Sequence, residues 1–131
     1  MVMIPSLPLT DRTVLVVEDD CIIAEDLAEM LREAGARVVG PAESLPQAIR
    51  LTEHGEAPHV ALLDIDLQGV AVFPLVVRLR AANVPMLFLT GIGCTNIPEE
   101  FADILCVAKP FGAGRIVDKV ASLLSRLPAS S

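Results

Sequence analysis

The stretch Val60-Ala61-Leu62-Leu63-Asp64-Ile65-Asp66 decides how this chain folds. Its first four residues form a short, unbroken apolar run, which is typical of a strand buried on both faces of a parallel sheet. Asp64 ends that run abruptly. In open α/β sheets, ligands bind in the crevice beyond the carboxyl ends of the strands, so Asp64 stands where an acid can do chemistry. Because Asp also favours turns, the stretch by itself leaves a solvated strand end equally open.

Apolar runs and amphipathic stretches alternate on both sides of this strand. We expect further strands at Thr13–Val17, Arg37–Gly40, Met86–Leu89 and Ile104–Ala108. We expect helices from Cys21 to Gly35 with Asp20 as the N-cap, from Ser44 to about His54, over Val72–Ala82 and over Ala113–Leu127, with a brief helical turn at Pro98–Phe101. This alternation predicts one α/β domain whose parallel sheet is covered on both faces.

The domain is expected to occupy residues 11–127, with a loose leader at residues 1–10 and a frayed tail at residues 128–131. The leader is apolar, but it contains Pro5 and Pro8 and has no basic residue before Arg12, so it does not resemble a signal peptide. No apolar run approaches the ~18 residues that indicate a membrane span. We therefore expect no membrane association.

The cysteines indicate the redox compartment. Cys21, Cys94 and Cys106 are odd in number, widely spaced and mostly set in apolar surroundings. This pattern is typical of free thiols in a reducing compartment and gives no sign of a disulfide framework or a zinc site. It predicts a cytoplasmic protein with three unpaired thiols.

The charge of the chain disfavours nucleic acid as a partner. The net charge is −7, with 17 acidic against 10 basic side chains, and the basic residues form no cluster. Proteins that bind nucleic acids neutralise phosphates with grouped Lys and Arg. The chain also has no Trp or Tyr and four Phe, so it lacks aromatic platforms for stacking bases.

Polar side chains that follow the strands predict a metal site. In a parallel sheet all carboxyl ends share one edge, so Glu18, Asp19 and Asp64 should meet there and repel one another unless a cation joins them. Hard oxygen ligands favour Mg²⁺. We expect Asp19 and Asp64 to be direct ligands and Glu18 to hold a metal-bound water. The backbone carbonyl of Asp66 could complete the set.

A hydroxyl and an ammonium group at the same edge favour phosphoryl transfer. Thr90 follows the fourth strand and Lys109 follows the fifth. Transfer of a phosphoryl group depends mainly on positioning and on neutralising charge on its oxygens. A carboxylate can be the nucleophile and form an acyl phosphate, and Asp64, at the centre of the sheet, is the natural candidate.

These residues carry a resemblance to response-regulator receiver domains. The matching motifs are Val-Val-Glu18-Asp19-Asp20, Leu-Leu-Asp64, Phe-Leu-Thr90-Gly91 and Lys109-Pro110-Phe111, in order over nearly the full length. The resemblance implies a flavodoxin-like fold with strand order 2-1-3-4-5, Mg²⁺, a cis peptide before Pro110 and a phosphorelay. It implies Asp64 as the phosphoacceptor, with a histidine kinase or histidine phosphotransfer protein as the donor. The expected chemistry is self-catalysed phosphotransfer and autodephosphorylation, without other enzymatic activity.

The chain departs from the receiver pattern around its fourth helix. Receivers often carry a Tyr or Phe three residues before the lysine, and here that position is Cys106. The interval between Thr90 and Lys109 is short, which predicts a short or mobile fourth helix. The Phe-x-Thr-Gly sequence at Phe88 resembles a subgroup of stand-alone receivers that work with HWE-type histidine kinases. In receivers, the face formed by the fourth strand, this brief helix and the last helix commonly docks partners or forms homodimers.

Two other functions stay open at this stage. A receiver-like adaptor that never takes phosphate would keep the same fold. A phosphatase of the haloacid-dehalogenase type would use the Asp-x-Asp at Asp64 and Asp66, although such enzymes place that motif on their first strand. A dinucleotide site is disfavoured because acids, rather than a glycine-rich turn, follow the first strand.

Overall fold

A five-stranded parallel sheet forms the centre of the computed structural model, which describes residues 7–91, 94–95 and 97–125. The strand order is β2-β1-β3-β6-β7. These strands are β1 (Thr13–Val17), β2 (Arg37–Ala42), β3 (Val60–Asp64), β6 (Met86–Thr90) and β7 (Leu105–Ala108). Counted along the chain, this is the predicted order 2-1-3-4-5, and the flavodoxin-like α/β fold is confirmed.

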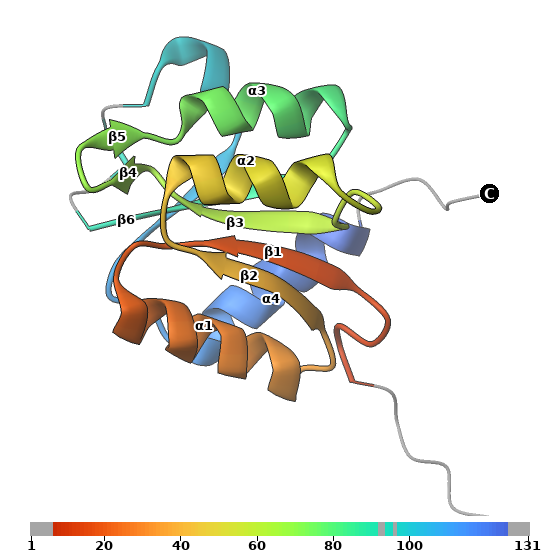
Figure 1. Ribbon diagram of the computed structural model, residues 1–131. Coiled ribbons are helices and arrows are strands. Elements are labelled where there is room, and N and C mark those ends of the chain that lie inside the picture. The colour runs from red at the N-terminus through yellow and green to blue at the C-terminus, as the bar shows by residue number, and fades with distance from the viewer. Residues whose placement is uncertain (1–6, 92–93, 96, 126–131) are drawn as a thin grey trace, which may run out of the picture.

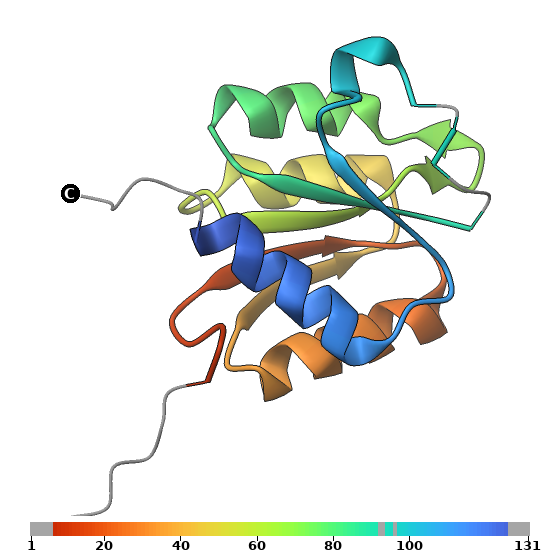
Figure 2. The same cartoon turned by 180° about the vertical axis from the view of Figure 1, so that it is seen from behind.

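Two layers of helices enclose the sheet. Helices α1 (Cys21–Glu33) and α4 (Ala113–Ser125) cover one face, and α2 (Leu45–Glu53) and α3 (Phe73–Ala81) cover the other (Figures 1 and 2). Successive strand residues point to opposite faces, so both sets of side chains are buried. Leu15 and Leu63 join the core under α2 and α3, whereas Val14 and Leu62 join the core under α1 and α4. This double cover explains why the strands are apolar throughout.

The predicted helix starts are confirmed. The Asp20 carboxylate accepts hydrogen bonds from the backbone N–H of Ile22 at 2.9 Å and of Ile23 at 3.2 Å, which caps α1. The Ser44 hydroxyl accepts one from the Gln47 N–H at 3.3 Å and caps α2. Each cap satisfies N–H groups that have no partner inside the helix. Local sequence is therefore sufficient to fix both starts.

The connection between β6 and β7 contains one short 3₁₀ helix, η1 (Glu99–Phe101), in its described part. The prediction of a short fourth helix is confirmed, while residues 92, 93 and 96 of this connection lie outside the described residues. Phe101 anchors η1, because its ring is buried and stacks on Phe73 with 5.2 Å between centroids. The guanidinium group of Arg80 lies 5.5 Å from the centre of the same ring.

Several boundaries differ from the sequence predictions. Strand β2 continues to Ala42 through a cis peptide bond at Gly40-Pro41, and a second cis bond precedes Pro110, as the resemblance implied. Helix α4 is described to Ser125, so the expected end at Leu127 and the tail at residues 128–131 lie outside the described residues. A small antiparallel hairpin of β4 (Asp66–Leu67) and β5 (Val70–Ala71) follows β3 and was not predicted.

The expected loose leader does not include Leu9, because the Leu9 side chain is fully buried in the core under α1 and α4. The Leu9 backbone N–H also donates to the carbonyl of Ala34 at 2.8 Å. Burying a leucine stabilises a fold by about 1.5–3 kcal/mol. The ordered domain therefore begins before residue 11.

The prediction of three free thiols is wrong. Cys94 and Cys106 form a disulfide with 6.0 Å between their Cα atoms, while Cys21 is free and exposed. Twelve residues separate the pair in sequence. Cys94 lies beside β7, with its Cα atom at a distance from that of Cys106 that suits a disulfide. Spacing along the chain gave no sign of that proximity.

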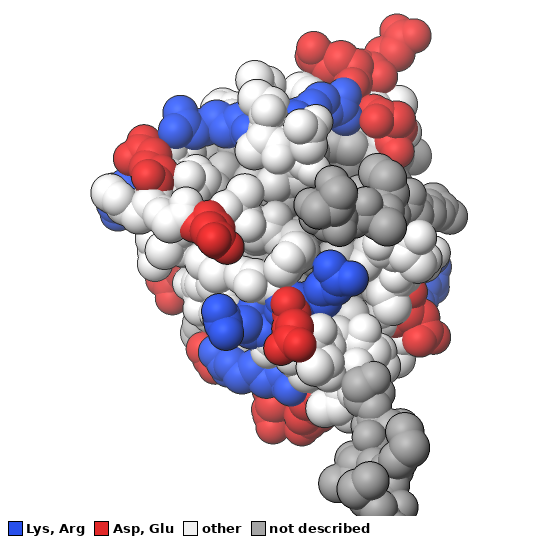
Figure 3. Space-filling model, turned by 90° about the vertical axis from the view of Figure 1, so that its right-hand side faces the viewer, with Lys and Arg blue, Asp and Glu red and all other residues white. Residues whose placement is uncertain are grey.

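The surface opposite the carboxyl ends of the strands carries both signs of charge. In Figure 3, Lys and Arg side chains lie interspersed with Asp and Glu side chains over this face.

None of the described helices is both long enough and apolar enough to cross a membrane.

Candidate functional site

Strand register brings the predicted site residues to one edge of the sheet. Glu18 and Asp19 directly follow β1, Asp64 ends β3, Thr90 ends β6, and Lys109 directly follows β7. The strands pair in parallel, with Val17 opposite Leu63, Asp64 opposite Leu89 and Thr90 opposite Ala108. All five predicted side chains therefore emerge at the carboxyl edge, as expected for ligand-binding residues in an open α/β sheet.

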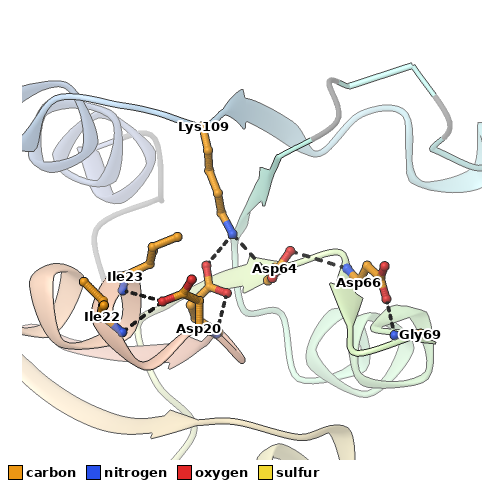
Figure 4. Close-up of polar contacts among 8 residues, drawn as sticks. Asp20, Ile22, Ile23, Asp64, Asp66, Gly69 and Lys109 are labelled. Atoms are coloured by element: carbon orange, nitrogen blue, oxygen red, sulfur yellow. Dashed lines mark hydrogen bonds and ion pairs between the residues drawn. The ribbon is translucent and has the colours of Figure 1, made fainter.

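Lys109 links the acids from the two central strands. Its Nζ lies 2.5 Å from Glu18 Oε1 and 3.4 Å from Asp64 Oδ2 (Figure 4). Glu18 is fully buried, and its second carboxylate oxygen accepts a hydrogen bond from the Asp20 N–H at 3.2 Å. Both oxygens of Glu18 are thus engaged by groups of the protein itself. A buried carboxylate needs such partners, because removing an unpaired charge from water is costly.

Asp64 is an unusually basic carboxyl group. It is 7% exposed, and its pKa is raised to about 7 by burial first, and then by the hydrogen bond and negative charge of Glu18. The charge of Lys109 acts in the opposite direction but does not offset these effects. Asp64 therefore gains strongly from any cation that enters this edge of the sheet.

Asp19 behaves differently although it lies beside Asp64. Partial burial acts to raise its pKa, but hydrogen bonds with Glu18 and Asp64 and with the backbone N–H groups of Gln68 and Asp19 itself lower the pKa below its ordinary value. Two neighbouring carboxyl groups with opposite shifts share the available protons unequally. Asp19 is the one that stays ionised as the pH falls.

Thr90 and Lys109 are held together by the backbone. The Lys109 N–H donates to the Thr90 carbonyl at 2.7 Å, and the Thr90 side chain is buried. Burial acts to lower the pKa of Lys109, but contacts with Glu18 and Asp64 outweigh it and raise that pKa above the ordinary value. The ammonium group is therefore charged at neutral pH. A fixed positive charge therefore lies beside the Asp64 carboxylate, and Thr90 ends the neighbouring strand.

The three acids fit a divalent cation. Glu18, Asp19 and Asp64 each offer a carboxylate oxygen, and these oxygens all lie within 4.8 Å of one another. One ammonium group, that of Lys109, lies against these three carboxyl groups, so the cluster is left with a net negative charge when all three are ionised. Carboxylate oxygens with space for water and phosphate oxygens are the ligands that Mg²⁺ takes in proteins.

Three further polar side chains have structural roles. The Asp20 side chain caps α1 and points away from Asp64 (Figure 4). The Asp66 carboxylate accepts a hydrogen bond from the Gly69 N–H at 2.7 Å and so closes the turn of the β4–β5 hairpin, while the Asp66 N–H lies 3.4 Å from Asp64 Oδ1. His59 Nδ1 accepts from the Thr13 N–H at 2.9 Å, which fastens the start of β1.

Gln68 is a site residue that the sequence interpretation missed. Its backbone N–H reaches Asp19 because Gln68 and Gly69 both adopt positive φ, 55° and 87°, in a two-residue hairpin turn. Glycine in a two-residue link between apolar residues is a known signal for this turn. The signal was present in the sequence, but the neighbouring strands are only two residues long.

Comparisons with known proteins agree with this geometry. Residues 14–121 match the sequence profile of the response regulator receiver domain. The transcriptional regulatory protein PdtaR of Mycobacterium tuberculosis is 31% identical over 121 residues, which cover 88% of this chain and 58% of PdtaR. The phyllosphere-induced regulator PhyR of Methylorubrum extorquens is 29% identical over 75% of this chain and 38% of PhyR. The chain thus spans about half the length of the curated relatives that it matches.

A solved structure supports the same relationship. A putative response regulator from Chloroflexus aurantiacus superposes with a TM-score of 0.76 at 31% identity, covering 88% of this chain and 98% of that one. The sequence profile, the relatives and the fold all lead to one assignment. The chain belongs to the response regulator receiver domain family.

Proposed function

We propose that this domain accepts a phosphoryl group on Asp64 from a phosphohistidine of a histidine kinase or histidine phosphotransfer protein. The observation that carries the proposal is the placement of Asp64 beside two further acids and a charged ammonium group, with the buried Thr90 at the end of the neighbouring strand. A buried carboxyl group with a raised pKa at a strand end is typical of functional sites, which favours phosphoacceptance over an adaptor role.

In the proposed step, one Asp64 carboxylate oxygen attacks the phosphorus atom of the donor. A P–O bond forms, the P–N bond to the donor imidazole breaks, and the imidazole keeps the electron pair. Lys109, 3.4 Å from Asp64 Oδ2, is placed to exchange part of its contact with Asp64 for the incoming phosphoryl oxygens. Thr90, at the end of the neighbouring strand, would donate its hydroxyl to the same oxygens.

Receiver domains typically bind Mg²⁺ at an acidic pocket, and the donor set here suits it. We propose Asp19 and Asp64 as ligands through their carboxylates, the backbone carbonyl of Asp66 as a further ligand, and Glu18 as the acceptor for a metal-bound water. Bound Mg²⁺ would neutralise charge on the phosphoryl oxygens during transfer. Glu18 also holds Lys109 in place, so it would orient the metal water and the ammonium group together.

The proposed chemistry of this domain is limited to its self-catalysed phosphorylation and the hydrolysis of the resulting acyl phosphate. The relatives PdtaR and PhyR are named as regulators, which supports a role in a regulatory pathway. The proposed output surface is the face formed by β6, η1, β7 and α4, where Leu105 is 39% exposed. A partner protein or a second copy of the domain would dock there. The Phe-x-Thr-Gly sequence at Phe88 supports an HWE-type kinase as donor.

Incubation with Mg²⁺ and phosphoramidate, followed by intact mass measurement, tests the proposal. The native chain should gain one phosphoryl group, and Asp64→Asn should gain none. Asp118→Asn is a matched control, because it makes the same change at an exposed carboxylate of α4 and keeps the nucleophile. The adduct should disappear when the metal is chelated.

The same experiment separates the rival functions. A lack of adduct with phosphoramidate, acetyl phosphate and a phosphorylated histidine kinase would refute phosphoacceptance and favour an adaptor. Sustained release of phosphate from small phosphate esters would favour a phosphatase of the haloacid-dehalogenase type. An equal adduct on Asp64→Asn would show that another residue is the acceptor.

A further inference from the structure

The Cys94–Cys106 disulfide lies close to the two residues that would contact the phosphoryl group. Cys94 lies four residues after Thr90, and Cys106 lies three residues before Lys109. The Lys109 N–H donates to the Thr90 carbonyl at 2.7 Å. The disulfide ties Cys94 to β7, and this hydrogen bond ties the end of β6 to the residue that follows β7.

The disulfide is accessible and lies outside the part of the core that holds the domain together. Cys94 is exposed, and Cys106 packs against the margin of the core under α2 and α3. Both cysteines line a groove of about 970 Å³ along the exposed edge of β7. The buried residues of the two cores come from all five strands and all four helices without them. A reductant can reach this bond, and the fold does not depend on it.

We propose that Cys94 and Cys106 form a reversible dithiol–disulfide switch that controls how readily Asp64 accepts a phosphoryl group. The proposal rests on the proposed function of Asp64. In this proposal, the cysteine pair controls phosphorylation at a position where receivers often carry an aromatic residue, here Cys106. The partner it implies is a dithiol reductant, with hydrogen peroxide as the oxidant.

The redox chemistry balances without further reactants. In reduction, one thiolate of the reductant attacks Cys94 Sγ, and Cys106 leaves as a thiolate and takes a proton from water. The second thiol of the reductant then displaces Cys94, so two electrons and two protons reach the protein and the reductant becomes a disulfide. In oxidation, hydrogen peroxide converts one thiolate to a sulfenic acid, which condenses with the other thiol and releases water.

The disulfide form should favour the unphosphorylated state. In the present structure it coexists with a Lys109 that lies closer to Glu18, at 2.5 Å, than to Asp64, at 3.4 Å. Phosphorylation requires Lys109 and Thr90 to turn toward the phosphoryl oxygens. The disulfide restrains that movement, because Cys94 follows Thr90 by four residues and cannot move away from β7 while the bond is intact. Reduction removes this restraint.

Thermodynamic linkage predicts a second measurable effect, a change in the reduction potential of the disulfide when a phosphoryl analogue binds. If the disulfide weakens binding of a phosphoryl analogue, the analogue must make the disulfide easier to reduce by the same factor. We expect a factor of at least about five, which is at the low end of measured couplings between sites. A factor of five corresponds to a rise of about 20 mV in the reduction potential of this two-electron couple.

The test uses the full chain with Cys21→Ser, so that Cys94 and Cys106 are its only cysteines. Intact mass should show a loss of two hydrogens on oxidation by hydrogen peroxide and their recovery with dithiothreitol. Initial rates of phosphorylation by phosphoramidate with Mg²⁺ should be at least about fivefold higher in the reduced form. Cys94→Ser, a change at an exposed position, should match the reduced form under both conditions. A glutathione redox titration with and without beryllofluoride measures the reciprocal shift.

The outcomes separate this inference from the proposed function. Equal phosphorylation rates in the two redox states, with a reduction potential that beryllofluoride leaves unchanged, would overturn the switch and leave Asp64 as the acceptor. Faster phosphorylation of the oxidised form would also overturn it. A lack of phosphorylation in both states would refute the proposed function, and the switch would fall with it. A disulfide that stays intact at strongly reducing potentials would show a purely structural bond.

Discussion

Replacing Asp64 by Asn should stabilise the metal-free domain, although it removes the phosphoacceptor. Asp64 is 7% exposed and shares its edge with Glu18 and Asp19 within 4.8 Å. Ionising it therefore places a third negative charge in a buried cluster that Lys109 does not balance. Asparagine has nearly the same shape and carries no charge. The gain in stability should appear when Mg²⁺ is absent and shrink when Mg²⁺ is bound.

The pKa of Asp64 sets the size and the sign of this effect. Its pKa is about 7 in the folded chain against a reference of 3.8. Between these values the folded state holds a proton that the unfolded state has lost, so the free energy of unfolding falls by about 1.4 kcal/mol per pH unit. The decline starts near pH 4 and ends just above pH 7, for a total of about 4 kcal/mol. Asp64→Asn lacks this decline.

Urea denaturation from pH 5 to pH 8, with and without Mg²⁺, measures the effect. At pH 8 without Mg²⁺ we expect Asp64→Asn to be about 2–4 kcal/mol more stable than the native chain, with a smaller difference at pH 5. Added Mg²⁺ should stabilise the native chain more than the variant. Asp118→Asn removes an exposed carboxylate from α4 and should change neither the slope nor the Mg²⁺ response. A native chain as stable as Asp64→Asn at pH 8 without metal would refute this reasoning.

Three further substitutions test other parts of the structure by urea denaturation. Lys109→Met should cost about 3–5 kcal/mol, because it leaves the fully buried Glu18 carboxylate without its ammonium partner. Asp20→Ala should cost about 1 kcal/mol by removing the cap of α1 while leaving Mg²⁺ affinity, measured by calorimetry, within about twofold. Gly40→Ala should cost about 3 kcal/mol or more, because φ is +93° there and a Cβ would lie 2.7 Å from the Ala42 backbone nitrogen.

Each of these substitutions has a matched control. Lys119→Met changes a lysine of α4 away from the acidic cluster and should cost well under 1 kcal/mol. A loss of Mg²⁺ binding in Asp20→Ala as large as in Asp19→Ala would make Asp20 a ligand rather than a cap. Gly55→Ala has φ +79° but no atom within 4 Å of the added Cβ, so it carries the conformational cost without the clash. Equal losses at Gly40 and Gly55 would rule out close packing as the cause.

The elements that could be predicted depend on local signals. The buried strands are apolar runs, the helix caps are Asp20 and Ser44, and each follows from chemistry within a few residues. The convergence of Asp19, Asp64 and Lys109 was also predictable, since parallel strands bring all their carboxyl ends to one edge. These features need no knowledge of distances between remote residues.

Apart from the short β4–β5 hairpin and the extension of β2, the errors concern residues whose partners lie elsewhere in the chain. Leu9 follows two prolines and looks like part of a loose leader, but the folded chain gives it a place in the core under α1. The Gln68 N–H reaches Asp19 only because the β4–β5 turn folds toward the end of β1. Such contacts depend on tertiary geometry and leave no local trace.

The sequence by itself determined the architecture and the identity of the chemical groups around Asp64. Both depend on local patterns, namely the alternation of strands with helices and the residues that follow each strand. Tertiary structure alone decided how those groups are paired. It buried Glu18 against Lys109, raised the pKa of Asp64 to about 7 and placed Cys94 within 6.0 Å of Cys106, Cα to Cα. Charge interactions and disulfide bonds depend on distance and burial, which the order of residues does not give. Folding brings Glu18, Asp19 and Asp64 together in one site, and it brings Cys94 close enough to Cys106 to form a disulfide.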